Sequence, residues 1–120
     1  YGRIEVRAKL PASRRGLWPA IWLLPTNDAY GAWPSSGEID VAEHGGWQQD
    51  GLVHSAAHSA SYNPLVGSQR SSSMLVPDAH ETFHTYCLDW NEERLLILID
   101  NDLSLSVENS GKGIAGALLN

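Results

Sequence analysis

Short segments in which hydrophobic and polar residues alternate make up most of this chain. The first segment runs from Ile4 to Leu10 and ends at Pro11, and its period of two predicts a half-buried β-strand. The segment from Leu17 to Leu24 is almost continuously apolar, which predicts a strand covered on both faces. We therefore expect sheet rather than helix in the first part of the chain.

The remainder of the chain follows the same pattern. A polar, Ser-rich stretch over 61–78 predicts a loop that borders a cleft. The sequence Asp100-Asn101-Asp102 predicts a hairpin turn, because Asn tolerates the positive φ that such turns need. Many short antiparallel strands joined by turns predict an all-β fold, an antiparallel β-sandwich. The further strands are expected over 38–44, 53–59, 82–90, 95–100 and 103–107.

Composition and charge narrow the class of protein. With 120 residues and 42% hydrophobic content, the chain is long enough for one domain with a core. A formal net charge of −6 argues against nucleic acid and anionic membranes as partners, and it places no obstacle before a neutral polysaccharide. No segment reaches the ~18 consecutive apolar residues of a transmembrane helix. The single cysteine, Cys87, allows no internal disulfide, and we expect it in the core.

Three carboxyl groups lie within six residues, from Glu38 to Glu43. In a regular strand, Glu38 and Asp40 would point to one face and Glu43 to the other. A β-bulge at Val41 or Ala42 would consume one residue without advancing the pleat. We therefore predict a bulge that brings all three acids to one surface.

Such a row of acids is suited to glycoside hydrolysis. Like charges a few ångströms apart raise at least one pKa, so one carboxyl can attack a sugar while another donates a proton. With the bulge discounted, the Cα atoms of Glu38 and Glu43 are roughly 13 Å apart. Their side chains can close to the ~5–5.5 Å expected of a retaining glycosidase. The spacing leaves two points open. It does not say which glutamate attacks the sugar, or whether the strand is an amphipathic strand whose carboxylates are simply exposed to solvent.

Four blocks of the sequence resemble glycoside hydrolase family 16, in its laminarinase-like (endo-β-1,3-glucanase) branch, and they come in the family's order: Tyr1–Pro11, Leu17–Pro25, Tyr30–His44 and Phe83–Tyr86. The resemblance implies a jelly-roll sandwich with the acids on its concave sheet. It also implies that Glu38 is the nucleophile, Asp40 the assisting acid and Glu43 the general acid/base. Residues 1–109 are then expected to be the central part of a catalytic domain, and residues 110–120 a divergent, flexible tail.

The function implied by this resemblance is that of a secreted, monomeric, endo-acting retaining hydrolase of β-1,3-glucan. The expected partner is the polysaccharide itself, with no cofactor and no metal ion. Calcium is a common structural ion in the family, but we do not predict it here. The alternative is a non-catalytic carbohydrate-binding module or an inactive fragment of such an enzyme. The presence of both Glu38 and Glu43 argues against that alternative.

Five tryptophans raise the question of sugar contacts, because indole faces pack on the C–H faces of sugar rings. Trp33 lies five residues before the first acid in a Gly/Pro loop, and we predict that it forms a sugar platform. Trp18 and Trp22 lie in the apolar segment and are predicted to be core residues. Trp90 is also predicted to pack in the interior, whereas the role of Trp47 is left open.

The histidines offer a competing chemistry. His58 resembles a cleft histidine of laminarinases, and we predict a contact with substrate or with the acidic row. A zinc site is the alternative, although no H-E-x-x-H signature is present. The candidate ligands of this zinc site are His54, His58, His80, His84, Asp40, Glu43 and His44.

Overall fold

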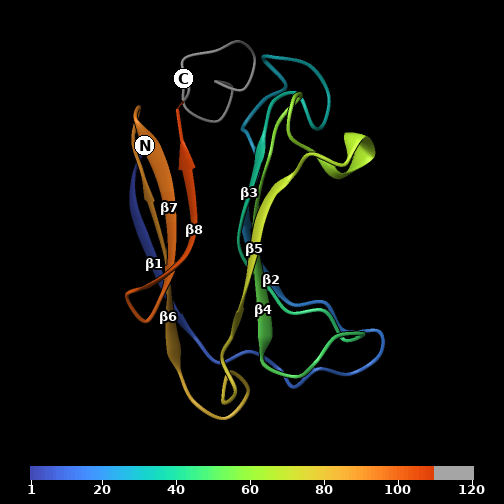
Figure 1. Ribbon diagram of the computed structural model, residues 1–120, viewed down its shortest axis with the longest axis vertical. Helices are drawn as coiled ribbons and strands as arrows, with labels where there is room; N and C mark the ends of the chain where they lie inside the picture. Colours follow the sequence, from blue (N-terminus) through green and yellow to red (C-terminus); the bar gives the residue numbers. More distant parts are fainter. Residues whose placement is uncertain (110–120) are drawn as a thin grey trace.

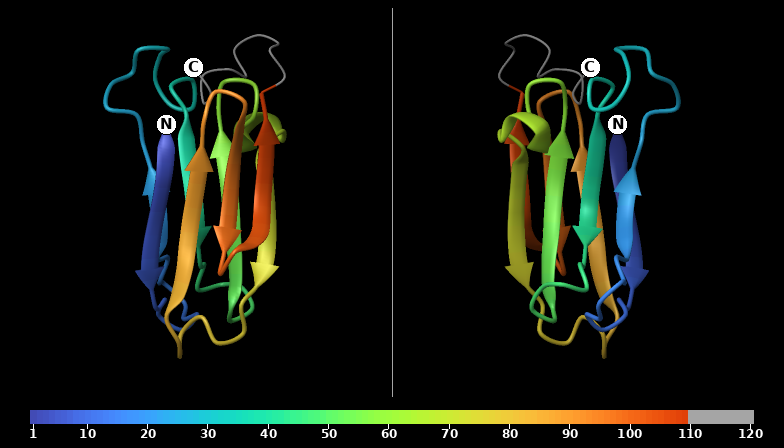
Figure 2. Two further views of the ribbon diagram at one scale, coloured as in Figure 1. Left: turned by 90° about the vertical axis from the view of Figure 1, so that its left-hand side faces the viewer. Right: turned by 90° about the vertical axis from the view of Figure 1, so that its right-hand side faces the viewer.

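Two four-stranded antiparallel sheets face each other in the computed structural model, which describes residues 1–109 (Figures 1 and 2). One sheet has the order β1-β6-β7-β8, formed by Gly2–Ala8, His84–Trp90, Arg94–Ile99 and Asp102–Glu108. The other has the order β2-β3-β4-β5, formed by Ala20–Leu23, Glu38–Glu43, Leu52–His58 and Arg70–Leu75. The predicted all-β sandwich is confirmed, while the predicted tail over 110–120 lies outside the described residues.

The core lies between the two sheets and is built from the inward faces of their strands. Leu88 and Ile97 come from the first sheet and Ile39 and Val53 from the second, and all four are almost fully buried. Each such side chain contributes about 1.5–3 kcal/mol relative to exposure. The two sheets are therefore held face to face by their apolar surfaces.

The predicted strand over 17–24 is present in part, but the prediction that both of its faces are covered is wrong. Only Ala20–Leu23 forms a strand, and among the described residues β2 pairs with β3 alone and therefore lies at an edge of its sheet. Its inner face is half-buried, but Trp22 on the outer face is 51% exposed and the preceding Trp18 is 62% exposed. Neither tryptophan is a core residue, because no second layer within residues 1–109 covers the outer face of this sheet.

The predicted loop over 61–78 is also partly wrong. It contains a short 3-10 helix, η1, at Pro64–Val66, and the strand β5 at Arg70–Leu75. β5 pairs antiparallel with β4 at the sheet edge, with Met74 opposite Val53. An edge strand exposes much of its surface, so a serine-rich sequence forms it without the usual apolar alternation.

Other local predictions agree with the structure. β7 and β8 are joined at Asp100 and Asn101, whose φ values of 50° and 73° are positive as the turn requires. Cys87 is buried, and this burial raises the pKa of its thiol. Trp90 is partly buried against the core and meets Tyr1 edge to face.

No helical segment in residues 1–109 has the length and hydropathy that crossing a membrane requires.

Candidate active site

The predicted bulge in β3 is confirmed. The register with β2 passes from Asp40 directly to Ala42, which leaves Val41 as the additional residue. Opposite β4, the register shifts between Asp40 and Glu43. Val41 and Ala42 are 2% and 0% exposed, so two successive side chains point into the core. Glu43 is consequently returned to the outer face that carries Glu38 and Asp40.

Two of these carboxyl groups have nitrogen partners from neighbouring segments. The indole Nε1–H of Trp33 donates a hydrogen bond to Oε2 of Glu38. Nε2 of His58 lies 3.0 Å from Oδ2 of Asp40, which is nearly fully buried. The structure therefore places both sequence-predicted companions, Trp33 and His58, beside the acids, and their rings lie 6.2 Å apart.

Glu43 has a partner that the sequence reading missed. Nε1–H of Trp18 donates to its Oε1 at 2.9 Å. The ring of Trp18 is in turn packed edge to face against Trp47, which is also 62% exposed. A signal was present: Trp18, Ala20 and Trp22 are spaced by two residues, as side chains on one face of a strand are.

The environment of the row raises the pKa of both glutamates. Burial is the main cause at Glu43, followed by repulsion from Asp40, while the bond from Trp18 acts in the opposite direction. At Glu38, burial raises the pKa, the Trp33 bond opposes it, and Asp40 raises it further. The row can therefore hold protonated and ionised carboxyls together, which acid–base chemistry requires.

The pKa of His58 is raised mainly by its hydrogen bond to Asp40, against the effect of burial. A protonated imidazole at this position faces the acids and offsets part of their negative charge.

Two hollows flank the row on the outer face of the second sheet. One of about 350 Å³ lies on the Glu38 side and includes Trp22 and Trp33 in its lining. The other, of about 230 Å³, lies on the Glu43 side and includes Trp18 and Trp47. The prediction that the segment 61–78 borders a cleft is confirmed in part, since residues from this segment also line the second hollow. The acids thus lie between two aromatic-walled spaces.

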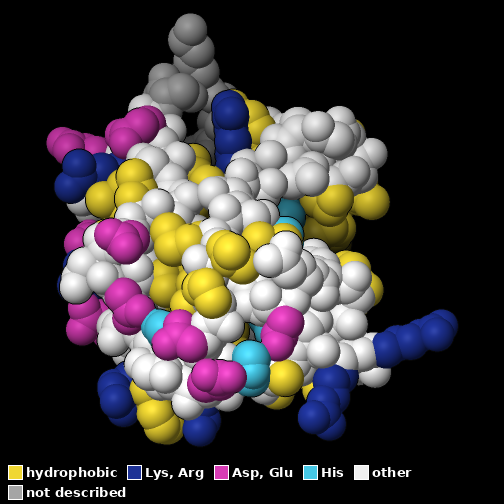
Figure 3. Space-filling view, turned by 60° about the horizontal axis from the view of Figure 1, so that its bottom comes forward, with side chains coloured by type: hydrophobic (Ala, Val, Ile, Leu, Met, Phe, Trp, Pro, Cys, Tyr) yellow, Lys and Arg dark blue, Asp and Glu magenta, His cyan; other side chains and the backbone are white. Residues whose placement is uncertain are grey.

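The histidines of the zinc hypothesis do not gather at one point. His44 is buried away from the acids, where Gly51 donates to its Nε2 at 3.0 Å. His84 lies at the other end of β6 from Trp90 and contacts Asp78 and Asp100. Figure 3 shows histidine and acidic side chains adjoining one another at that end of the sandwich. Among residues 1–109, no three His, Cys, Asp or Glu side chains are arranged to hold a metal ion.

Comparison with known proteins gives consistent matches. The family model described as glycosyl hydrolases family 16 matches residues 1–116. A β-glucanase of Rhodothermus marinus is 48% identical over 105 residues, which cover 86% of this chain and 36% of that protein. A β-1,3-glucan-binding protein of Penaeus monodon is 37% identical over 118 residues, covering 90% and 31% of the two chains.

A solved structure carries the same fold. The crystal structure of a non-specific family 16 endo-β-1,3(4)-glucanase, co-crystallised with 1,3-β-D-cellotriosyl-glucose, matches with a TM-score of 0.91 and 36% identity. The match covers 100% of this chain and 46% of that one. The predicted jelly-roll class is thereby confirmed. The chain spans less than half the length of each of these relatives.

Proposed function

The chain belongs to glycosyl hydrolases family 16, and from this membership we propose that it carries the catalytic strand of an endo-acting retaining hydrolase of β-1,3-glucan. The observation that carries the proposal is the bulge in β3, which brings Glu38, Asp40 and Glu43 to one face. The β-glucanase and endo-β-1,3(4)-glucanase relatives support a glucan as substrate. Because such polymers lie outside cells, we propose a secreted protein.

In the proposed mechanism, the carboxylate of Glu38 attacks the anomeric carbon while the carboxyl of Glu43 protonates the departing glycosidic oxygen. Glu43 then removes a proton from the water that releases the sugar from Glu38. Asp40 shares a proton with Glu38, and His58 holds Asp40 in place through its hydrogen bond. The division of roles between the glutamates follows the resemblance of the motif.

The two environments share the same effects, burial that raises the pKa and an indole N–H that lowers it, and each effect has a use in the proposed roles. The raised pKa of Glu43 keeps it protonated at higher pH than an exposed glutamate, as a general acid needs. The indole N–H of Trp33 stabilises the ionised form of Glu38 against the effect of burial. We expect a bell-shaped dependence of kcat/KM on pH. Ionisation of Glu38 sets its acid limb, and loss of the proton from Glu43 sets its alkaline limb.

A second candidate function is carbohydrate binding without catalysis. It is favoured by the similarity to the β-1,3-glucan-binding protein of Penaeus monodon. The exposed indoles beside the acidic row would serve binding equally well. The presence of both glutamates favours the hydrolase.

The test is the release of reducing sugar from laminarin by the 120-residue chain and by a longer form with flanking sequence. Glu38→Gln is expected to abolish turnover. Glu92→Gln, at an exposed turn between β6 and β7, serves as the matched control and should retain full activity. NMR of the first-formed product should show a retained anomeric configuration.

Each contrary result has a distinct meaning. An inverted first product would exclude Glu38 as a nucleophile. Binding of laminarin without release of sugar by either form would favour the binding module.

A further inference from the structure

A β-bulge interrupts each of the two sheets. In β3 the additional residue is Val41. In β8 the pairing with β7 goes from Leu105 directly to Leu103, which leaves Ser104 as the additional residue. A bulge leaves its extra residue unpaired and disrupts the ladder around it. Both bulges therefore need support from contacts outside the regular pairing of the strands.

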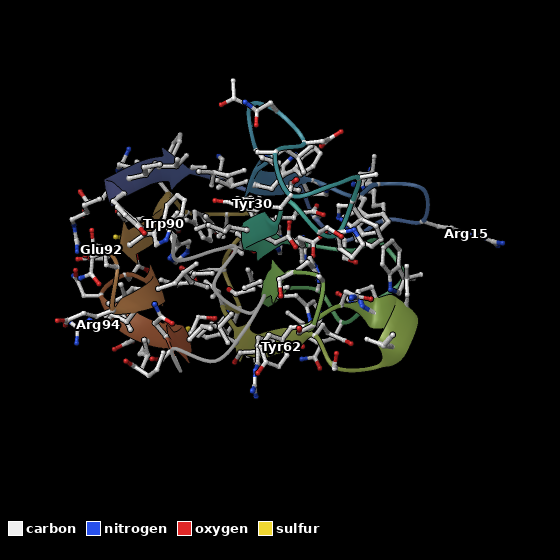
Figure 4. The ribbon with its side chains drawn as sticks, turned by 90° about the horizontal axis from the view of Figure 1, so that it is seen from above. Arg15, Tyr30, Tyr62, Trp90, Glu92 and Arg94 are labelled. Carbon is white, nitrogen blue, oxygen red and sulfur yellow. The ribbon has the colours of Figure 1, made fainter. Side chains whose placement is uncertain are left out.

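Ser55 joins the two bulges. It lies on β4 at the point where two residues of β3, Val41 and Ala42, stand opposite one residue, and it is 0% exposed. Its Oγ lies 3.0 Å from the carbonyl oxygen of Val41 and 2.9 Å from Oγ of Ser104. β4 and β8 belong to different sheets, which Figure 4 shows end-on with the interior between them. One buried hydroxyl thus connects the irregular point of each sheet.

The direction of both hydrogen bonds follows from the chemistry of the groups. A carbonyl oxygen can only accept, so the single hydroxyl hydrogen of Ser55 goes to Val41, and Ser104 must donate to Ser55. The two bonds form a chain in which each one polarises the next. Val41 is itself only 2% exposed, so water has little access to its carbonyl. The chain therefore runs from β8 through Ser55 to the bulged residue of β3.

The bulge divides β3 between the two glutamates. Glu38 and Asp40 precede Val41 and pair in regular register with β4. Glu43 follows Val41, and it faces the same side as the other acids only because the bulge adds one residue. A change in the backbone at Val41 should consequently move Glu43 and leave Glu38 in place.

Burial alone does not explain the contacts of Ser55. Ser59, which directly follows β4, is also 0% exposed, but its hydroxyl has no hydrogen-bond partner among residues 1–109. The fold therefore tolerates a buried serine without a side-chain partner at that position. Ser55 differs because its hydroxyl meets the carbonyl of the bulged residue.

We propose that Ser55 is a positioning residue for the general acid: its hydroxyl, supported by Ser104, fixes the carbonyl of Val41 and thereby the direction of Glu43. The proposal rests on the proposed function, which assigns the role of acid and base to Glu43. Transfer of a proton from a fixed carboxyl depends on geometry, and a misplacement of about 1 Å can cost about a hundredfold in rate. Ser55 acts through the backbone of β3 and not on the substrate itself.

The kinetic test is the pH dependence of laminarin hydrolysis by Ser55→Ala, with Ser59→Ala as the matched control. We expect kcat to fall about tenfold with little change in KM, because the geometry of proton transfer is lost rather than contacts to sugar. The alkaline limb of the kcat/KM profile should move to lower pH, since Glu43 loses burial and proximity to Asp40, the two main causes of its raised pKa. The acid limb, set by Glu38, should stay in place.

Three kinetic results would overturn the proposal. The first is a fall in kcat without movement of the alkaline limb. The second is equal movement of both limbs, which indicates general disturbance of the fold. The third is a profile for Ser55→Ala that matches the profile of Ser59→Ala.

An NMR measurement separates this inference from the proposed function, because it needs no turnover. The indole N–H of Trp18 is bonded to Glu43, and that of Trp33 is bonded to Glu38. In Ser55→Ala the signal of Trp18 should shift and the signal of Trp33 should not. If the chain does not hydrolyse laminarin, the hydrolase proposal fails, but this difference can still be observed. Shifts of both signals, or of neither, would contradict the role of Ser55.

Ser104→Ala decides the matter if Ser55→Ala does not fold. It keeps the donor to Val41 and removes only the support from β8. We expect a smaller change of the same kind, about threefold in kcat, with an NMR shift at Trp18 and not at Trp33. An alkaline limb and a Trp18 signal identical to those of the parent would exclude this chain of hydrogen bonds as the support of Glu43.

Discussion

His44 provides the most quantitative prediction, because its imidazole joins three segments of the chain at the end of β3. Its side chain is buried, and it is only 1% exposed as a residue. Nε2 accepts from the amide of Gly51 at 3.0 Å, and Nδ1 lies 3.1 Å from the carbonyl oxygen of Pro11. Since an amide can only donate and a carbonyl only accept, the proton resides on Nδ1.

His44→Ala would leave the amide of Gly51 and the carbonyl of Pro11 without these partners. The amide of Gly51, a buried residue, costs about 1–3 kcal/mol when it is left unsatisfied, whereas the carbonyl of Pro11, an exposed residue, can turn to water, so the total is about 1–3 kcal/mol before the lost packing of the imidazole is counted. For a domain of this size, we expect the Tm to fall by about 5 °C or more. In His44→Gln the amide oxygen can still accept from Gly51, and we expect roughly half of the loss.

The measurement is urea denaturation at 25 °C followed by circular dichroism, with thermal unfolding as a second readout. His80→Ala is the matched control, because His80 lies in the same part of the fold but its side chain is 29% exposed. If His44→Ala costs no more than His80→Ala, the hydrogen bonds of His44 do not stabilise the fold as described. If His44→Gln is as destabilising as His44→Ala, the acceptor for the amide of Gly51 does not contribute either.

Three further outcomes follow from the site and its supports. Trp18→Phe removes the donor that stabilises ionised Glu43 and should move the alkaline limb of the kcat/KM profile on laminarin to higher pH; an unmoved limb would contradict this. Deletion of Val41 straightens β3 and turns Glu43 toward the core, so laminarin hydrolysis should disappear, and full activity would exclude the role of the bulge. The pKa of His84 is raised by its bond to Asp100, so its stabilisation is complete below about pH 6.5 and is lost as pH rises through the raised value. His84→Gln should therefore cost more stability at pH 5.5 than at pH 8.5, and an equal cost by urea denaturation would oppose it.

Much of the fold and the acidic row could be predicted from the sequence, because both depend on local geometry. The period of two in the hydrophobic pattern predicts the strands. The positive φ of Asn101 follows from the tolerance of asparagine for the left-handed region. Counting residues from Glu38 to Glu43 was sufficient to predict the bulge, since the side-chain period of a strand is two. The resemblance of the motif supplied the roles of the acids, which remain predictions.

What the sequence could not determine was which strands lie at a sheet edge and which faces remain uncovered. Trp18 and Trp22 read as core residues, yet β2 is an edge strand whose outer face borders the acids. The segment of β5 was predicted to be a loop, because its sequence is rich in serine; within residues 1–109 it pairs only with β4.

The tertiary structure alone decided the partners of the functional groups. Glu43 receives its hydrogen bond from Trp18, which lies 25 residues earlier, and His44 points away from the acids although it is the next residue along the chain. Alternation along a strand is a property of neighbouring residues, but exposure and pairing depend on which distant segments pack on each face. For that reason the sequence by itself determined the row of acids, and only the packing of the sandwich determined what surrounds it.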